Sequence, residues 1–331
     1  MGYDRISLLP DSLLTQILLH LPTKDSVKTS LLSTRWRNLW LDVPGLDLHS
    51  NDFRYSSSAI KTFTDKFLEL NRESRLLKFK IKYDECNVYL FGISEWFVTA
   101  INRGAQVLDV DTLRCPFYKD FMPLDVYKSK TLVSLKLVNV EARKLVSGCP
   151  VLEDLTLCRS FDDKLPVALR VMSQTLKRFC VKSGPGIESD APGLKCIDFR
   201  DDDRVVGKNL SFFLMVDIDT KFNLHEFLNG VSSVRRSMII SQRTIKELYR
   251  CLNMEPISKF HNLSRLEVSF FSDLLLQVLP NFLEISPNLK YLTLIKEMIA
   301  GEETGMARVR IAKTTTMKLA KQKKKIWMEV V

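Results

Sequence analysis

Short apolar triplets recur along most of the chain and predict a repeated strand. Each copy follows the pattern apolar-x-x-apolar-x-apolar, whose last two apolar residues lie two positions apart, as on one face of a strand. The aligned copies are Leu76-Phe79-Ile81, Ala105-Leu108-Val110, Leu132-Leu135-Leu137, Leu152-Leu155-Leu157, Leu176-Phe179-Val181, Leu194-Ile197-Phe199, Leu210-Phe213-Met215, Leu263-Leu266-Val268, Leu289-Leu292-Leu294 and a poorer one within 234–240. Stacking such strands side by side buries what no single copy can cover.

The spacing of these copies predicts a leucine-rich-repeat architecture. From Leu76 to Leu289 the average interval is about 24 residues, which falls within the range of that repeat. Single intervals vary, so the connecting segments differ, and two of them predict helices behind the strands. One apolar stripe is Ile60, Phe63, Phe67 and Leu70, and the other is Ile93, Trp96, Phe97, Ala100 and Ile101. We expect Trp96 to be a core residue.

The N-terminal stretch from Leu9 to Trp40 predicts three short helices. Pro10 suits a first helical turn and Leu21-Pro22 ends the first helix, while Thr23 is a candidate N-cap for the second. The third helix is expected to begin near Ser33 or Thr34 and to carry both tryptophans. The first helix has one broad apolar face. A unit of roughly forty residues is near the lower size limit for independent folding, so we expect this face to need another protein as cover.

The residues of this stretch resemble an F-box of the plant type. The matching positions are Leu9-Pro10, Ile17-Leu18, Leu21-Pro22, Leu32-Ser33, Trp36-Arg37 and Leu39-Trp40, with 4–7 and 42–46 as similar flanks. The resemblance implies a module that binds the Skp-family adaptor of a cullin-RING ubiquitin ligase, while the rest of the chain holds a protein substrate. It implies a non-catalytic receptor subunit.

The residues expected to contact the adaptor or to shape the module share an apolar character and a place at a helical signal. They are Leu9, Pro10, Leu13, Leu14, Ile17, Leu18, Leu21, Val27, Leu32, Trp36, Leu39 and Trp40. The sequence does not separate those that touch the adaptor from those that pack inward. In the alternative interpretation, these leucines only pack into the core of the chain itself, which predicts no adaptor binding.

Two repeat copies extend the resemblance to plant F-box/leucine-rich-repeat proteins. Their openings, Gly148-Cys149-Pro150-Val151-Leu152-Glu153 and Ser286-Pro287-Asn288-Leu289-Lys290, are similar to those of that family. The expected fold is α/β: a three-helix F-box followed by an irregular leucine-rich-repeat solenoid of parallel strands with helical or loop backing. We expect an F-box module at 1–45, repeats at 46–295 and a basic, mobile tail at 296–331. Within the tail a frayed helix is expected around 317–328. The FBD-type domain with which plant relatives commonly continue is not recognisable after Ile295.

The net charge of +10 lies mostly in the tail. Between Thr304 and Val331 there are eight basic residues and one acidic residue, whereas the body is nearly balanced. We interpret the tail as a solvated end, at most with a weak nuclear-import patch at Lys321–Lys325. Two alternatives stay open: an interaction scaffold whose F-box-like helices bind no adaptor, and a nucleic-acid binder acting through the tail.

The remaining composition argues against an enzyme, a metal protein and a membrane protein. Seven cysteines lie at scattered spacings without a CxxC pair beside four histidines, which favours buried free thiols in an intracellular protein, nuclear or cytoplasmic. Phosphate-binding and hydrolase motifs are missing, and the acidic residues at 198–203, 217 and 219 are interpreted as a solvated loop. We expect no cofactor, no metal and no membrane segment.

Overall fold

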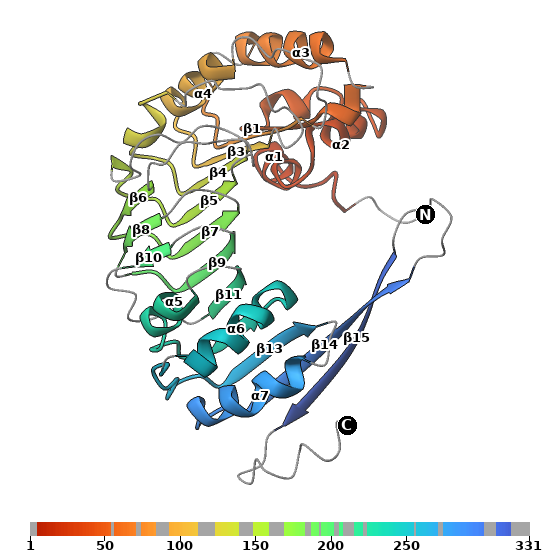
Figure 1. Cartoon of the computed structure of the whole chain (residues 1–331). Helices are drawn as coiled ribbons and strands as arrows, with labels where there is room; N and C mark the ends of the chain where they lie inside the picture. The colour runs from red at the N-terminus through yellow and green to blue at the C-terminus, as the bar shows by residue number, and fades with distance from the viewer. Residues whose placement is uncertain are drawn as a thin grey trace. The chain divides into compact units, whose positions relative to one another are not determined.

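The computed structural model places two compact units along the chain, Met1–Asp163 and Lys164–Val331. It describes residues 5–53, 56–70, 74–83, 93–111, 123–138, 148–158, 169–182, 187–191, 193–201, 205–207, 215–220, 224–254, 256–270, 274–300 and 309–318. Figure 1 labels the elements of both units.

The first unit opens with a short helical module, which we define as residues 5–43. It contains α1 (Asp11–Leu19), α2 (Thr23–Lys28) and the 3₁₀ segments η1 (Thr29–Leu31) and η2 (Leu39–Asp42). The third helix expected from Ser33 onward is wrong. Trp36 and Leu39 instead donate their backbone N–H groups to the carbonyls of Ser33 and Trp36, three residues back. Such bonds suit short, tight turns and do not continue into a long helix.

Five parallel strands follow in the first unit, each beside the next in chain order. They are β1 (Gly45–His49), β2 (Lys78–Lys82), β3 (Val107–Asp111), β4 (Ser134–Val138) and β5 (Asp154–Cys158). The two predicted helical stripes form α3 (Ser57–Leu70) and α4 (Ile93–Asn102), and short 3₁₀ segments lie at η3 (Ser50–Phe53) and η4 (Val126–Lys128). Strands and backing segments therefore alternate along the chain.

The register of these strands places the repeated apolar residues in rows. One row joins Leu46, Phe79, Leu108, Leu135 and Leu155, and all five side chains are buried. A second row, two residues further along, joins Leu48, Ile81, Val110, Leu137 and Leu157, which are also buried. The polar residues between the two rows point to the other face because side chains alternate along a strand. Strand β1 was not among the aligned copies.

The second unit continues the pattern with parallel strands β7 (Arg178–Lys182), β9 (Cys196–Asp201), β11 (Met215–Thr220), β12 (Ser237–Ile240), β13 (Arg265–Phe270) and β14 (Tyr291–Ala300). Its helices are α5 (Leu224–Gly230), α6 (Gln242–Met254) and α7 (Leu274–Ile285). A separate three-stranded parallel sheet contains β6 (Leu169–Met172), β8 (Ile187–Asp190) and β10 (Val205–Gly207). The α/β fold of N-terminal helices and repeated parallel strands is confirmed.

Two details of the second unit differ from the sequence-based expectation. In β11 the residues in register with Ile197 and Phe199 are Val216 and Ile218, so the copy aligned on Leu210-Phe213-Met215 is placed three residues too early. In the expected tail, Val309–Lys318 forms β15, which pairs antiparallel with β14. The predicted helix around 317–328 is wrong at Met317 and Lys318. Its remainder and the basic patch at Lys321–Lys325 lie outside the described residues.

Candidate protein-binding site

One side of α1 builds the core of the helical module. Leu14 and Leu18 are fully buried and form a cluster with Trp36, Leu39 and Val43. The first two residues are four positions apart and therefore lie on the same side of the helix. Leu9 and Leu19 pack against this cluster from its margin.

The adjoining side of α1 carries large apolar side chains that the described residues leave partly exposed. Leu13 and Ile17 are 43% and 45% exposed, and Leu21, just beyond the helix, is 37% exposed. Their four-residue spacing places Leu13 and Ile17 on one side of the helix, which we call the α1 apolar face. Two more exposed leucines follow α2: Leu31, the last residue of η1, is 86% exposed, and the next residue, Leu32, is 70% exposed. Exposed aliphatic side chains gathered in one small module are typical of a protein-binding surface.

Hydrogen bonds hold the segments of this module together. The indole Nε1 of Trp36 donates to Oγ of Ser7 at 2.9 Å. Arg35 forms an ion pair with Asp11 at 2.8 Å and also donates to the carbonyl of Leu9, so it joins the turn region to the start of α1. These bonds join the segment before α1 and the start of α1 to the turn region that follows α2.

The twelve residues expected at the site divide into three groups. Leu14, Leu18, Trp36 and Leu39 are buried, Leu9, Val27 and Trp40 are half-buried, and Pro10, Leu13, Ile17, Leu21 and Leu32 are exposed. Trp40 stacks on Phe63 of α3 at 6.4 Å between ring centroids, so its ring is engaged within the chain. Leu31 was not among the twelve, because the sequence pattern predicts Leu31 or Leu32 as an inward side chain of the second helix; that interpretation is wrong, since both are exposed.

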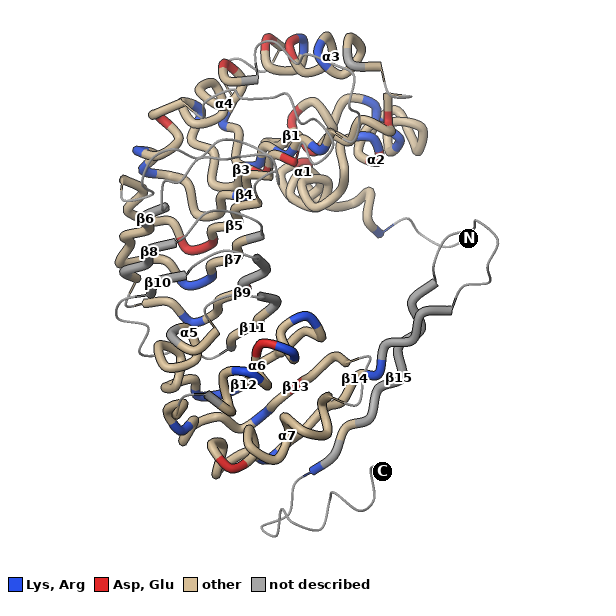
Figure 2. The backbone as a smooth tube through the Cα atoms, in the orientation of Figure 1, with Lys and Arg blue, Asp and Glu red and all other residues tan. Residues whose placement is uncertain are grey.

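On the other face of the first-unit strands, one row in register carries charges of alternating sign: Asp47, Lys80, Asp109 and Lys136. Figure 2 marks the charged positions along the chain. Asp109 of β3 lies between Lys80 of β2 at 3.7 Å and Lys136 of β4 at 3.1 Å, and Lys136 also reaches Asp111 at 3.5 Å. Burial alone would lower the pKa of Lys136, but the charges and hydrogen bonds of the two aspartates raise it above its ordinary value of 10.5. The charges of these lysines and aspartates are therefore neutralised by one another.

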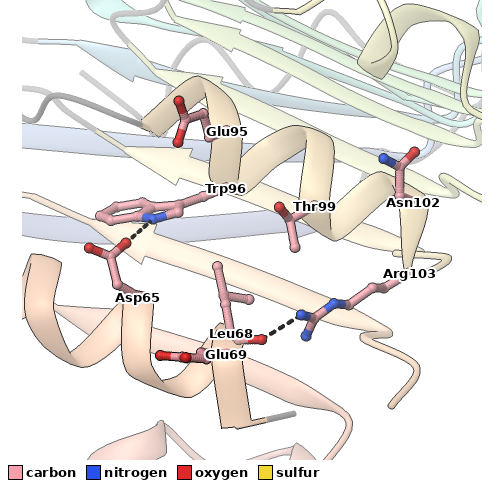
Figure 3. Close-up of a pocket in the computed structure, with 8 residues that line it drawn as sticks. All are labelled: Asp65, Leu68, Glu69, Glu95, Trp96, Thr99, Asn102 and Arg103. Atoms are coloured by element: carbon pink, nitrogen blue, oxygen red, sulfur yellow. Dashed lines mark hydrogen bonds between the residues drawn. The ribbon is translucent and has the colours of Figure 1, made fainter. Parts of the chain in front are cut away.

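A polar groove of about 610 Å³ lies between α3 and α4 (Figure 3). At one end Asp65 accepts hydrogen bonds from Nε1 of Trp96 and from Lys61, both at 2.7 Å. Burial alone would raise the pKa of Asp65, but these hydrogen bonds and the charge of Lys61 lower it below its usual 3.8. Trp96 is 4% exposed, which confirms the core position expected for it. At the other end Arg103 donates to the carbonyl of Leu68.

The described residues show neither a metal-binding cluster nor a membrane-spanning helix. Within these ranges no group of three or more His, Cys, Asp or Glu side chains is arranged to hold a metal ion. None of the helices in the described ranges combines the length and the apolar character that crossing a bilayer requires. The five described cysteines are free thiols, of which Cys149 is buried and the others are half-buried.

Known proteins are similar both to the helical module and to nearly the whole chain. The F-box domain model matches residues 6–47, which covers nearly all of the module and the first part of β1. Over 92% of this chain and 81% of the relative, the chain is 45% identical to an F-box/FBD/LRR-repeat protein of Arabidopsis thaliana. A second Arabidopsis thaliana protein of that description is 43% identical over 89% of this chain and 79% of the relative.

A third relative bears a slightly different name. F-box/LRR-repeat protein 13 of Arabidopsis thaliana is 37% identical over 91% of this chain and 78% of the relative. Identity at this level over nearly the whole chain includes both the helices at the start and the strands that follow. The chain therefore belongs to the F-box/LRR-repeat family of plant proteins.

Proposed function

We propose that this protein is the substrate-binding subunit of a Skp–cullin–F-box ubiquitin ligase. Its F-box binds the Skp-family adaptor, and its repeats bind a protein substrate. The single observation that carries the proposal is the division of α1, in which Leu14 and Leu18 form the core while Leu13 and Ile17 remain exposed within the F-box domain. Aliphatic side chains presented along one side of a helix suit a groove on a partner protein.

The exposed members of the expected site are the proposed adaptor contacts. They are Pro10, Leu13, Ile17, Leu21 and Leu32, to which we add Leu31. The buried members hold these side chains in place. Trp40 is assigned to the second group because its ring stacks on Phe63.

The chain itself contributes position and no reactive group to ubiquitin transfer in this proposal. Holding a substrate close to a charged conjugating enzyme raises the effective concentration of the reacting groups. The repeats and the F-box together would bring substrate and adaptor into one complex. Nucleus and cytoplasm are both compatible with this role.

Substitution of the α1 apolar face tests the proposal. Leu13→Ala with Ile17→Ala should weaken binding to a purified Skp-family adaptor by about tenfold or more, because truncating two aliphatic side chains that fill a partner's groove removes buried apolar contact area. Both side chains are half-exposed, so the free energy of unfolding should change little.

A matched control uses two exposed leucines outside the module. Leu70 and Leu124 are 74% and 50% exposed, and Leu70→Ala with Leu124→Ala should bind the adaptor as the unchanged protein does. Isothermal titration calorimetry of both double variants gives the two dissociation constants. Full adaptor affinity in the Leu13 and Ile17 variant would reject the proposal, and a wild-type protein that binds no adaptor would indicate an interaction scaffold.

A further inference from the structure

The C-terminal end of α1 lies directly against the first two strands. Gly45 opens β1, and a Cβ atom at this position would overlap Cδ1 of Leu19, the last residue of α1. The absence of a side chain at Gly45 therefore lets the helix end approach the strand closely. This contact brings the carbonyl end of α1 next to β2 as well, since Gly45 and Lys78 are partners in the β1–β2 register.

A lysine of β2 donates a hydrogen bond to the C-terminal end of this helix. Nζ of Lys78 donates to the carbonyl oxygen of Leu19 at 3.2 Å and forms an ion pair with Oδ2 of Asp47 at 2.6 Å. The last carbonyls of a helix lack partners within the helix and carry the negative end of its dipole, so a cation stabilises them. The last turn of α1 holds no basic residue, and Lys78 supplies the charge from 59 residues away in the chain.

The same contact region includes the start of α2. The backbone N–H of Asp47 donates to Oγ1 of Thr23 at 2.8 Å, and Thr23 is buried. The side chain of Lys78 is only 15% exposed, so its two polar bonds are largely shielded from water. Polar bonds in a shielded site hold their geometry more tightly than exposed ones, because water does not compete for the partners.

We propose that Lys78 is a positioning residue that sets the direction of α1, and with it the α1 apolar face, relative to strands β1 and β2. By joining the end of α1 to Asp47, it makes the helix and the first strands move together. The consequence for recognition rests on the proposed function: an adaptor bound to α1 is held at one angle to the first repeats. The local geometry itself does not depend on adaptor binding.

The test measures a distance distribution in the full chain. Spin labels carried by bio-orthogonal amino acids replace Gln16 on α1 and Lys130 before β4, two exposed positions in the first unit. Double electron–electron resonance then gives the distribution of distances between the two labels. Lys78→Met should broaden this distribution or shift its mean, and Lys78→Arg, which keeps the charge, should restore it in part.

The matched control comes from the same strand. Lys80→Met also removes one lysine from β2, but Lys80 contacts only Asp109, at 3.7 Å, among the ion pairs given above. It should leave the distribution unchanged. Equal distributions in Lys78→Met and Lys80→Met would overturn the proposal. Should Lys78→Met fail to fold, Asp47→Asn removes the ion pair without removing the lysine and is expected to broaden the distribution to a smaller degree, whereas no change would again overturn it.

Adaptor affinity, measured separately, keeps the two proposals distinct. The substitution at Lys78 leaves Leu13 and Ile17 intact, so the dissociation constant should change by less than about twofold. Loss of adaptor binding in the unchanged protein would reject the proposed function, while the distance measurement would still decide the role of Lys78.

Discussion

Trp36 donates its indole hydrogen to the hydroxyl of Ser7, across 29 residues of sequence. The bond ties the segment before α1 to a core tryptophan that is 5% exposed. Ser7→Ala should lower the free energy of unfolding by about 1 kcal/mol, since the indole donor of a buried tryptophan then loses its partner. Urea unfolding followed by fluorescence measures the change.

Trp36→Phe provides the companion measurement. It removes the donor and part of the ring volume, so its cost should exceed that of Ser7→Ala. In the double variant the two costs should not add, because both substitutions break the same bond. Full additivity would mean that the hydrogen bond contributes nothing.

Truncation on the two sides of α1 should cost very different amounts of unfolding free energy. Leu18 is fully buried, and Leu18→Ala should cost about 2–5 kcal/mol of unfolding free energy through lost packing and a cavity. Ile17, its neighbour, is 45% exposed, and Ile17→Ala should cost about 0.5 kcal/mol or less. Chemical denaturation of both variants distinguishes them, and similar costs would contradict the described orientation of α1.

Gly148 approaches the backbone of the preceding repeat. A Cβ at this position would overlap the carbonyl oxygen of Tyr127, and backbone atoms cannot rotate away. Gly148→Ala should therefore destabilise the first unit by about 1–3 kcal/mol. Gly193 is the comparison: its Cβ would meet the oxygen of Gln174 at 3.1 Å, so Gly193→Ala needs a smaller adjustment. Thermal unfolding of each variant gives the order, and a harmless Gly148→Ala would contradict it.

The ion pairs of Lys136 predict a dependence of stability on alkaline pH. The pKa of Lys136 is raised in the folded protein, so its contribution is complete below about pH 10.5 and disappears as the pH rises through the folded value. Its side chain is 37% exposed, which limits the contribution to about 0.5–1 kcal/mol. Lys136→Met should thus be less stable at pH 8, and its difference from the unchanged protein should shrink as the pH rises above 10.5. A difference that is independent of pH would exclude this origin.

The repeated strands could be predicted because their core residues follow a fixed phase. Phe79, Leu108 and Leu135 stand in one buried row, as the alignment of the triplets requires. Strand β1 was missed even though Val43, Leu46 and Leu48 show the same triplet. These residues overlap the end of the F-box resemblance, so they were assigned to that module and not compared with the repeats. The position of strand β11 was predicted three residues too early because the apolar run from 212 to 216 can be aligned with the triplet in more than one way.

Contacts between residues far apart in the sequence could not be predicted from local patterns. The helical spacing of α1 predicts an apolar stripe, but only packing against Trp36 and Leu39 decides that Leu14 and Leu18 belong to the core. The contact of Lys78 with Leu19 joins residues that no local pattern connects. The separate sheet of β6, β8 and β10 likewise has short strands without the triplet, so periodicity gave no signal for it.

The reversal of direction at β15 also affects how the chain behaves in solution. A parallel strand left at the border of a sheet offers a row of unpaired backbone groups to any other chain, and β15 covers β14 along ten residue pairs. The strand that now forms this border ends at Lys318, whose side chain is exposed. A lysine on a border strand disfavours pairing with a second chain, so at this border an edge strand that carries a charge takes the place of a bare parallel strand.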